Sequence, residues 1–136
     1  MLDEALGKYE EGLEIWRRYH PEKNSREGGF LENIGIVYHH QGQLDDALAI
    51  YKRARRIFRK TLGPESEELG KALRNTALVL KEQGKVEEAM DKFEEAVAIM
   101  KRALGDEHAI VADFLCDLAE CKEDAGDARG AIVLLR

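Results

Sequence analysis

The chain has 136 residues, of which 44% are hydrophobic, and a formal net charge of −6 from 21 Lys or Arg and 27 Asp or Glu. This length suits one domain with a modest core, and the acidic balance argues against nucleic acid as a partner, because basic charge supplies most of the affinity of nonspecific binding. With only two prolines and no alternating runs of β-branched or aromatic residues, the composition favours helices and leaves little room for a sheet.

The N-terminal segment, residues 1–21, is predicted to be helical and opens with the sequence LDEAL. It lacks the apolar core of a signal peptide, and no part of the chain has an apolar run long enough to span a membrane. We therefore expect a soluble cytoplasmic protein that does not insert into a membrane. The LDEAL pattern returns 42 residues later as LDDAL at residues 44–48.

The whole sequence repeats itself with a period of 42 residues. QGQLDDA at residues 41–47 is followed by QGKVEEA at 83–89, and a weaker copy surrounds Gly126. Large side chains keep the same register, so that Tyr9 aligns with Tyr51 and Phe93. An internal period of this length is typical of helical repeat proteins, in which each repeat is one supersecondary unit.

Each period predicts two helices. The first ends at a glycine, the residue best suited to the left-handed conformation of a helix stop. These first helices cover roughly residues 28–41, 70–83 and 112–125, and their glycines are Gly42, Gly84 and Gly126. The second helix begins a few residues later, with Asp or Glu in its first turn where the helix dipole favours them, and extends to Gly63 or Gly105.

The second helix carries one apolar stripe for packing. Ala47, Tyr51, Ala54 and Phe58 recur at spacings of four and three residues, which places them on one helix face. The first helix of each period has a small residue at one position, and these residues are Gly35, Ala77 and Ala119. We expect the small residues to let the partner helix approach closely.

These positions carry a family resemblance. The segment LENIGIVYHHQGQLDDALAIYKRA resembles the tetratricopeptide repeat, whose pattern is represented here by Leu31, Ile34, Gly35, Tyr38, Ala47, Tyr51 and Ala54. The usual period is about 34 residues, and the longer period with ALGDEHAIVADFLCDLA resembles the kinesin-light-chain type of the repeat. In the third copy Lys122 replaces the aromatic residue. The resemblance implies an all-α, right-handed superhelical solenoid of antiparallel helix pairs that acts as a non-catalytic protein-interaction module.

The repeats predict a single domain over residues 1–136. It would consist of the second helix of a partial repeat at 1–21, full repeats at about 28–63 and 70–105, and a partial repeat at 112–136. The last element, ARGAIVLLR, is shorter than its equivalents and ends in an apolar segment. Either the chain is cut from a longer array, or its terminal helices pair with another copy and form a homo-oligomer, which is the alternative function.

The resemblance also locates a peptide-binding groove, because in this family one face of the first helices lines the concave side. The residues predicted to lie there are Glu32, Asn33, Ile36, His40, Lys71, Arg74, Asn75, Leu78, Glu82 and Asp117. Asn33 and Asn75 occupy one repeat position, and an amide can both donate to and accept from a peptide backbone. Ile36 and Leu78 are expected to contact apolar side chains, and Lys71 and Arg74 to attract acidic residues of a protein partner. The alternative is a polar face that merely tolerates asparagine.

Nothing in the sequence supports an enzyme, a cofactor or a metal site. His39 and His40 are adjacent, so on a helix they diverge by about 100° and cannot form a same-face metal pair. Cys116 and Cys121 are five residues apart, which disfavours a mutual disulfide and favours free thiols in a reducing compartment. No phosphate-binding loop, dinucleotide fingerprint or nucleophile elbow is present.

Basic residues cluster once in the chain, on the outer side of the second predicted long helix. They are Lys52, Arg53, Arg56, Arg59 and Lys60. Such a stripe could bind an acidic segment or an anionic membrane surface. The alternative is a solvated helix face that has no binding role.

Overall fold

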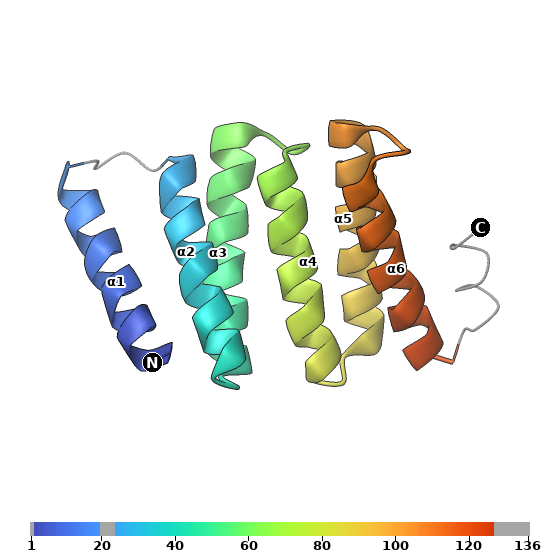
Figure 1. Ribbon diagram of the computed structural model, residues 1–136, viewed down its shortest axis with the longest axis horizontal. Helices are drawn as coiled ribbons and strands as arrows, with labels where there is room; N and C mark the ends of the chain where they lie inside the picture. The colour runs from blue at the N-terminus through green and yellow to red at the C-terminus, as the bar shows by residue number, and fades with distance from the viewer. Residues whose placement is uncertain (1, 20–23, 127–136) are drawn as a thin grey trace. The chain divides into compact units, whose positions relative to one another are not determined.

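The computed structural model describes residues 2–19 and 24–126, and every element in these ranges is an α-helix (Figure 1). The helices are α1 (Leu2–Tyr19), α2 (Ser25–His40), α3 (Leu44–Leu62), α4 (Glu67–Glu82), α5 (Val86–Leu104) and α6 (Ala109–Asp124). The predicted all-α helical repeat fold is confirmed. The predicted element ARGAIVLLR, at residues 128–136, and residues 20–21 of the predicted N-terminal helix lie outside the described residues.

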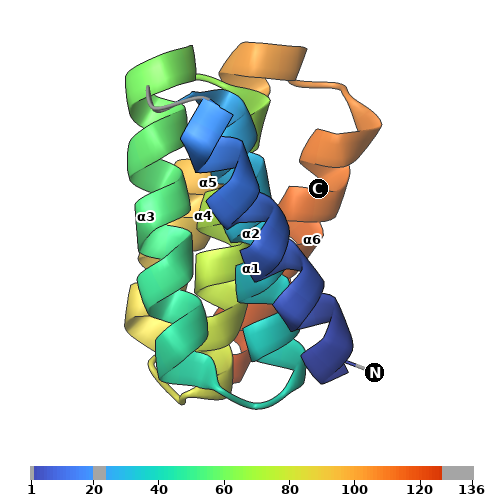
Figure 2. The ribbon, with the colours of Figure 1, turned by 90° about the vertical axis from the view of Figure 1, so that its left-hand side faces the viewer.

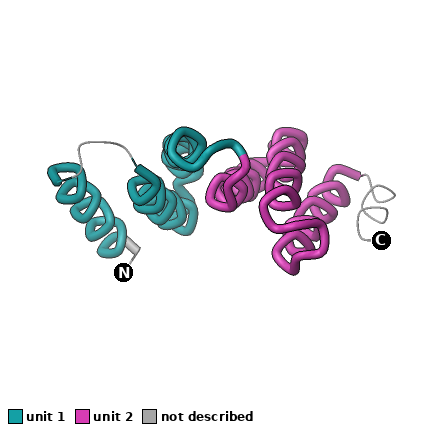
Figure 3. The backbone as a smooth tube through the Cα atoms, turned by 90° about the horizontal axis from the view of Figure 1, so that it is seen from above, with its two compact units in different colours: residues 1–64 teal, residues 65–136 magenta. Residues whose placement is uncertain are grey.

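The helices form two compact units, which Figure 3 colours separately: unit 1 comprises residues 1–64 and unit 2 residues 65–136. In unit 1, both α1 and α3 pack against α2, and Figure 2 shows α1 in front of α2. In unit 2, α5 packs against both α4 and α6. The division falls between the two full repeats, so each unit contains one complete helix pair and one additional helix. The single-domain organisation stays a prediction.

The first helix of each repeat begins three residues before the predicted starts at 28, 70 and 112, because a capping residue precedes it. The Asn24 side chain accepts from the backbone N–H of Arg26 at 3.0 Å. Ser66 Oγ accepts from the N–H of Leu69 at 3.2 Å, and His108 Nδ1 accepts from the N–H of Ile110 at 3.1 Å. Each cap satisfies a donor that would otherwise be unpaired at the helix start, so the helices begin at 25, 67 and 109.

The predicted glycine stops are confirmed. Gly42 has φ 78° and Gly84 has φ 80°, in the left-handed region. The N–H of Gly42 donates to the carbonyl of His39 at 3.0 Å and the N–H of Gln43 donates to the carbonyl of Tyr38 at 2.9 Å, the two bonds of a Schellman motif. The same pair of bonds recurs around Gly84. Each stop turns the chain within a few residues and starts the antiparallel helix.

The predicted packing stripe is also confirmed, since Ala47, Tyr51 and Ala54 have no exposed surface and Phe58 is 2% exposed. A Cβ atom placed on Gly35 would lie only 2.6 Å from Cε1 of Tyr51, so the helices approach closely because this residue lacks a side chain. In unit 2, a Cβ atom placed on Gly70 would likewise lie 2.6 Å from Sδ of Met100. In both complete helix pairs, a large side chain therefore packs on a small residue.

Candidate functional site

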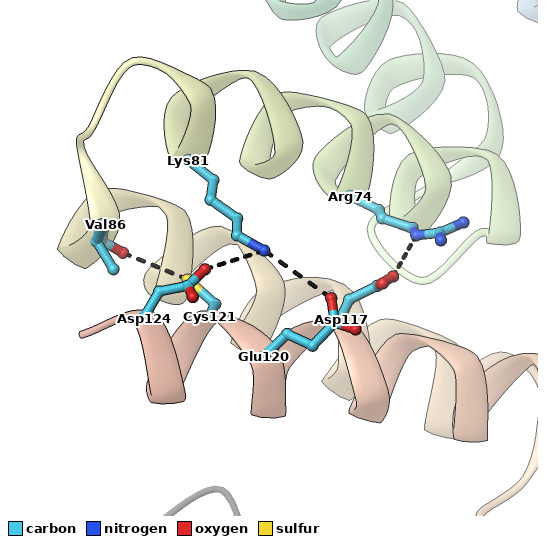
Figure 4. Close-up of polar contacts among 7 residues, drawn as sticks. All are labelled: Arg74, Lys81, Val86, Asp117, Glu120, Cys121 and Asp124. Atoms are coloured by element: carbon cyan, nitrogen blue, oxygen red, sulfur yellow. Dashed lines mark hydrogen bonds and ion pairs between the residues drawn. The ribbon is translucent and has the colours of Figure 1, made fainter. Parts of the chain in front are cut away.

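In unit 2, two predicted site residues contact each other across α4 and α6 (Figure 4). Nε of Arg74 donates to Oδ2 of Asp117 at 2.5 Å, and the guanidinium lies 5.2 Å from the ring centroid of the buried Phe114. The side chains of Arg74 and Asp117 are 37% and 17% exposed. Arg74 is thus fixed by a charge-assisted hydrogen bond and by an aromatic face, which strengthens the pair relative to a fully exposed one.

Lys81, one helical turn from the predicted Leu78, makes further ion pairs with α6 that sequence analysis missed. Its Nζ lies 3.1 Å from Oδ2 of Asp124 and 3.9 Å from Oε2 of Glu120. Burial lowers the pKa of Lys81, but the hydrogen bond and charge of Asp124 and the charge of Glu120 outweigh it, so the pKa is raised overall. Lys81 lies two turns beyond Arg74 on the helix, and this spacing is the only feature of the sequence that could have indicated its contact with α6.

A shallow surface depression lies beside these ion pairs, at the C-terminal end of α4. It is lined by Leu78, Lys81, Glu82, Val86 and Asp124. Two of these residues, Leu78 and Glu82, belong to the predicted site. The lining thus combines two apolar side chains with three charged ones, a composition that suits one side chain of a bound segment.

The other predicted residues of α4 form a stripe along its surface. Lys71 and Glu82 are exposed, and Asn75 and Leu78 are half-buried. Their spacing of four, three and four residues keeps all four within about 60° around the helix. The stripe is therefore one continuous strip with a cation, an amide, an apolar side chain and a carboxylate in order. We refer to Lys71, Asn75, Leu78 and Glu82 as the α4 stripe.

Unit 1 carries the corresponding stripe on α2. Asn33, Ile36 and His40 are exposed at the same repeat positions, Ile36 at 36%. Glu32, the remaining predicted residue, is half-buried and lines a second shallow depression together with Arg26, Gly29, Phe30 and Asn33. We refer to Asn33, Ile36 and His40 as the α2 stripe.

Next to the α2 stripe, α1 and α2 are joined by contacts that the sequence did not reveal. Arg17 donates from Nε and Nη2 to Oε1 of Glu27 at 2.9 and 2.8 Å, and the Glu27 side chain is only 5% exposed. Trp16 and Phe30 pack with ring centroids 6.0 Å apart. The equivalents of Glu27 in the other repeats are the buried Leu69 and Val111, so unit 1 replaces an apolar contact with an ion pair.

Chemically reactive groups are few in the described parts of the chain. Cys121 is buried and Cys116 exposed, and both are free thiols. Burial raises the pKa of Cys121, Lys81 opposes this and Asp124 adds to it, so the group is an unreactive thiol rather than a thiolate nucleophile. Within residues 2–19 and 24–126 there is no cluster of three or more potential metal ligands. No helix in these ranges is long and apolar enough to cross a membrane.

Helix pairs that recur every 42 residues, each stopped by a glycine and seated on a small residue, define a helical repeat protein. The model of the tetratricopeptide repeat family matches residues 29–102 and 77–136. The chain therefore belongs to the tetratricopeptide repeat family. Such repeats generally mediate protein–protein interactions, and scaffolds built from them are generally non-catalytic.

Solved structures share this fold at low sequence identity. BtubC (BKLC) from P. vanneervenii superposes with a TM-score of 0.89 at 23% identity, covering 98% of this chain and 52% of that one. A Podosopora anserina protein described as a kinesin light chain with nearly identical repeats gives 0.85 at 22%, covering 98% and 63%. The tetratricopeptide repeat domain of Arabidopsis FLU gives 0.70 at 24%, covering 80% and 88%.

These similarities confirm the kinesin-light-chain-like type of repeat at the level of fold. This chain spans about half of the first of those proteins and less than two thirds of the second. Among curated proteins, none matches the sequence significantly.

Proposed function

We propose that the chain is a non-catalytic interaction module that binds a peptide segment of a partner protein on the α4 stripe of unit 2, and that the α2 stripe of unit 1 is a second site of the same kind. One observation carries the proposal. The order amide, apolar side chain, polar side chain occurs at identical repeat positions in both units, as Asn33, Ile36 and His40 and as Asn75, Leu78 and Glu82. The repeat core does not need these residues, because they lie outside the buried set.

The chemistry of the stripes suits an extended peptide. An asparagine amide pairs with both the N–H and the C=O of a peptide backbone, which makes it independent of the peptide's sequence. The apolar residue three positions along, Ile36 or Leu78, offers a contact for one side chain. On α4, this residue also lines the depression described above. Backbone pairing supplies register and the apolar contact supplies selectivity.

The charge of the α4 stripe favours an acidic segment next to Lys71. Lys71 is exposed, whereas Arg74, for which we predicted the same role, already pairs with Asp117. A carboxylate of the partner must therefore compete with Asp117 for Arg74. At Lys71 it meets no competing carboxylate among the described residues. We assign the first electrostatic contact to Lys71 and a secondary one to Arg74.

The proposal is tested by selecting binders from a random peptide display library on the immobilised chain, followed by calorimetry with each selected peptide. We expect Asn75→Ala and Asn33→Ala to weaken binding about three- to tenfold, as the loss of one or two hydrogen bonds implies. Gln43→Ala is the matched control, because this exposed amide lies outside the stripes and its side chain makes no capping bond to α3. Peptides that bind all three variants as tightly as the wild type would refute the proposal.

A second candidate function is assembly through the terminal helices, and one observation favours it. Ile15 on α1 is 45% exposed, whereas its repeat equivalents Ile57 and Ile99 are 5% and 8% exposed. An apolar residue that the repeat elsewhere buries is thus open to a further chain. Light scattering over a range of concentrations tests this: the Ile15→Lys variant should lose any association that occurs through this face, and a monomeric wild type would contradict it.

A further inference from the structure

The basic residues of α3 form a single exposed row. Lys52, Arg53, Arg56, Arg59 and Lys60 are all exposed. Their spacing places them within about 120° around the helix and along about 12 Å of its length. Among the described residues, none of the five has an ion-pair partner. We call these five residues the basic row.

Comparison of the repeats shows that the fold does not require this charge. The first three positions of the basic row correspond, 42 residues away, to Glu10, Glu11 and Glu14 on α1 and to Glu94, Glu95 and Ala98 on α5. The same structural positions therefore accept acidic or neutral side chains in both neighbouring repeats. At these three positions only α3 carries basic side chains, whereas the last two positions are basic in all three repeats. Five like charges on one helix face repel one another. Folding stability gives no reason for this change from acidic or neutral to basic side chains on α3, whereas the binding of an acidic partner does.

An acidic row with the same geometry lies on α5. Its members are Glu87, Glu88, Asp91, Glu94 and Glu95, all exposed. Both rows follow the spacing i, i+1, i+4, i+7 and i+8. Lys122 lies 3.8 Å from Glu94 and Lys92 lies 3.8 Å from Glu95, but both carboxylates are more than half exposed, so these contacts compete only weakly. We call these five residues the acidic row.

We propose that the basic row on α3 of one copy docks against the acidic row on α5 of a second copy. The spacing is the same when read in either direction, so five opposite charges can face one another over equal lengths. An antiparallel arrangement is favoured, because it brings the C-terminal end of α3, at Leu62, next to the N-terminal end of α5, at Val86, where the helix dipoles attract. The partner is a second copy of this chain, recognised by charge complementarity.

Salt dependence provides the first test on the intact chain. Exposed charges are screened beyond about 8 Å at physiological ionic strength. Sedimentation velocity should therefore show a self-associating species at about 20 mM salt, weakened at least about tenfold at about 0.5 M. Association that persists unchanged at high salt, or none at low salt, would overturn the proposal. Association through the apolar face of α1 would persist and would be lost in Ile15→Lys.

A charge-swap mixture gives the sharper test. The first variant carries Lys52→Glu, Arg53→Glu and Arg56→Glu, and the second carries Asp91→Lys, Glu94→Lys and Glu95→Lys, the positions that face them in the antiparallel arrangement. Each variant alone then presents two rows of mostly like charge and should be monomeric. Mixed together they present opposite rows and should associate again. Failure of the mixture to associate, with both variants folded by circular dichroism, contradicts the pairing of these two rows.

A control variant with the same change in net charge distinguishes the effect of the basic row on self-association from the effect of net charge. Lys85→Glu, Lys101→Glu and Arg102→Glu change the net charge as much as the first variant does, at exposed sites outside both rows. This control should still self-associate at low salt with about the wild-type affinity, within about twofold. If it is as monomeric as the first variant, overall charge rather than the basic row governs association, and the proposal is wrong.

Discussion

Arg74 on α4 and Asp117 on α6 are joined by a hydrogen bond of 2.5 Å between side chains that are 43 residues apart in the sequence. The pair links two first helices of successive repeats within unit 2. Asp117 also neutralises the charge of Arg74, which lies next to the α4 stripe. A peptide that binds this surface as proposed would therefore compete with an internal ion pair.

This competition predicts opposite effects of two substitutions on the affinity for an acidic peptide selected as described above. Asp117→Asn removes the internal competitor and should raise the affinity about two- to fivefold, whereas Arg74→Gln should lower it by a similar factor. Calorimetry with one peptide and the three proteins measures both effects. Equal affinities would show that Arg74 takes no part in binding.

Two adjacent glycines of α2 should respond oppositely to alanine. A Cβ on Gly28 would lie 2.7 Å from Cε1 of Phe58, so Gly28→Ala should lower the free energy of unfolding by about 1–3 kcal/mol through overpacking. A Cβ on Gly29 meets nothing within 4 Å, so Gly29→Ala should raise it by about 0.5–1 kcal/mol through helix propensity. Denaturant unfolding of both variants measures the contrast, and equal effects would contradict the close packing.

The ion pair between Arg17 and Glu27 should be worth much more than its neighbour. Arg17→Met leaves a carboxylate that is 5% exposed without its partner and should cost about 2–3 kcal/mol of unfolding free energy. Arg18→Met is the control: Arg18 pairs with Glu14 at 3.3 Å, but both side chains are over two-thirds exposed, so the loss should stay below about 1 kcal/mol.

A double variant distinguishes the effect of the buried charge on stability from the effect of packing at Arg17 and Glu27. Glu27→Leu combined with Arg17→Met copies the apolar contact that Leu69 makes in the next repeat. It should recover most of the stability lost in Arg17→Met, because no charge is then left buried. Chemical denaturation of the three variants decides, and a double variant as unstable as the single one would show that the charges are not the cause.

Stability should fall in alkaline solution because of Cys121. Burial raises its pKa above the usual 9.0, so the folded state holds the proton to higher pH than the unfolded state does. This contribution is complete below about pH 9 and is lost as the pH rises through the raised pKa, by at most about 1.4 kcal/mol per pH unit. The unfolding free energy, measured between about pH 8 and pH 10, should therefore fall less steeply with pH in Cys121→Ala than in the wild type. An unchanged slope would contradict it.

Features that depend on local sequence and period were predictable from the chain alone. The stops at Gly42 and Gly84 and the stripe around Tyr51 recur at fixed spacing, and each rests on a backbone or packing requirement of a single helix pair. The helix starts were missed because Asn24, Ser66 and His108 differ in residue type, although all three cap at the same repeat position.

The site was only partly predictable, because ion pairs between helices depend on side-chain orientation. The sequence placed Asn75 and Leu78 on one face of α4 but did not indicate that Arg74 and Asp117 pair with each other. Lys81 and its partners on α6 were missed for the same reason. The ion pair between Arg17 and Glu27, which replaces an apolar contact, depends on how α1 packs on α2. The spacing of residues within one helix does not reveal that packing.

Mapping of peptide binding by backbone amide chemical shifts tests the central claim most directly. A selected peptide titrated into the labelled chain should shift the amides of the α4 stripe, Lys71, Asn75, Leu78 and Glu82, together with those of the α2 stripe. The amides of the basic row on α3 should stay unchanged and serve as the internal control. Shifts confined to α3 or α5, with the α2 and α4 stripes unaffected, would contradict the account.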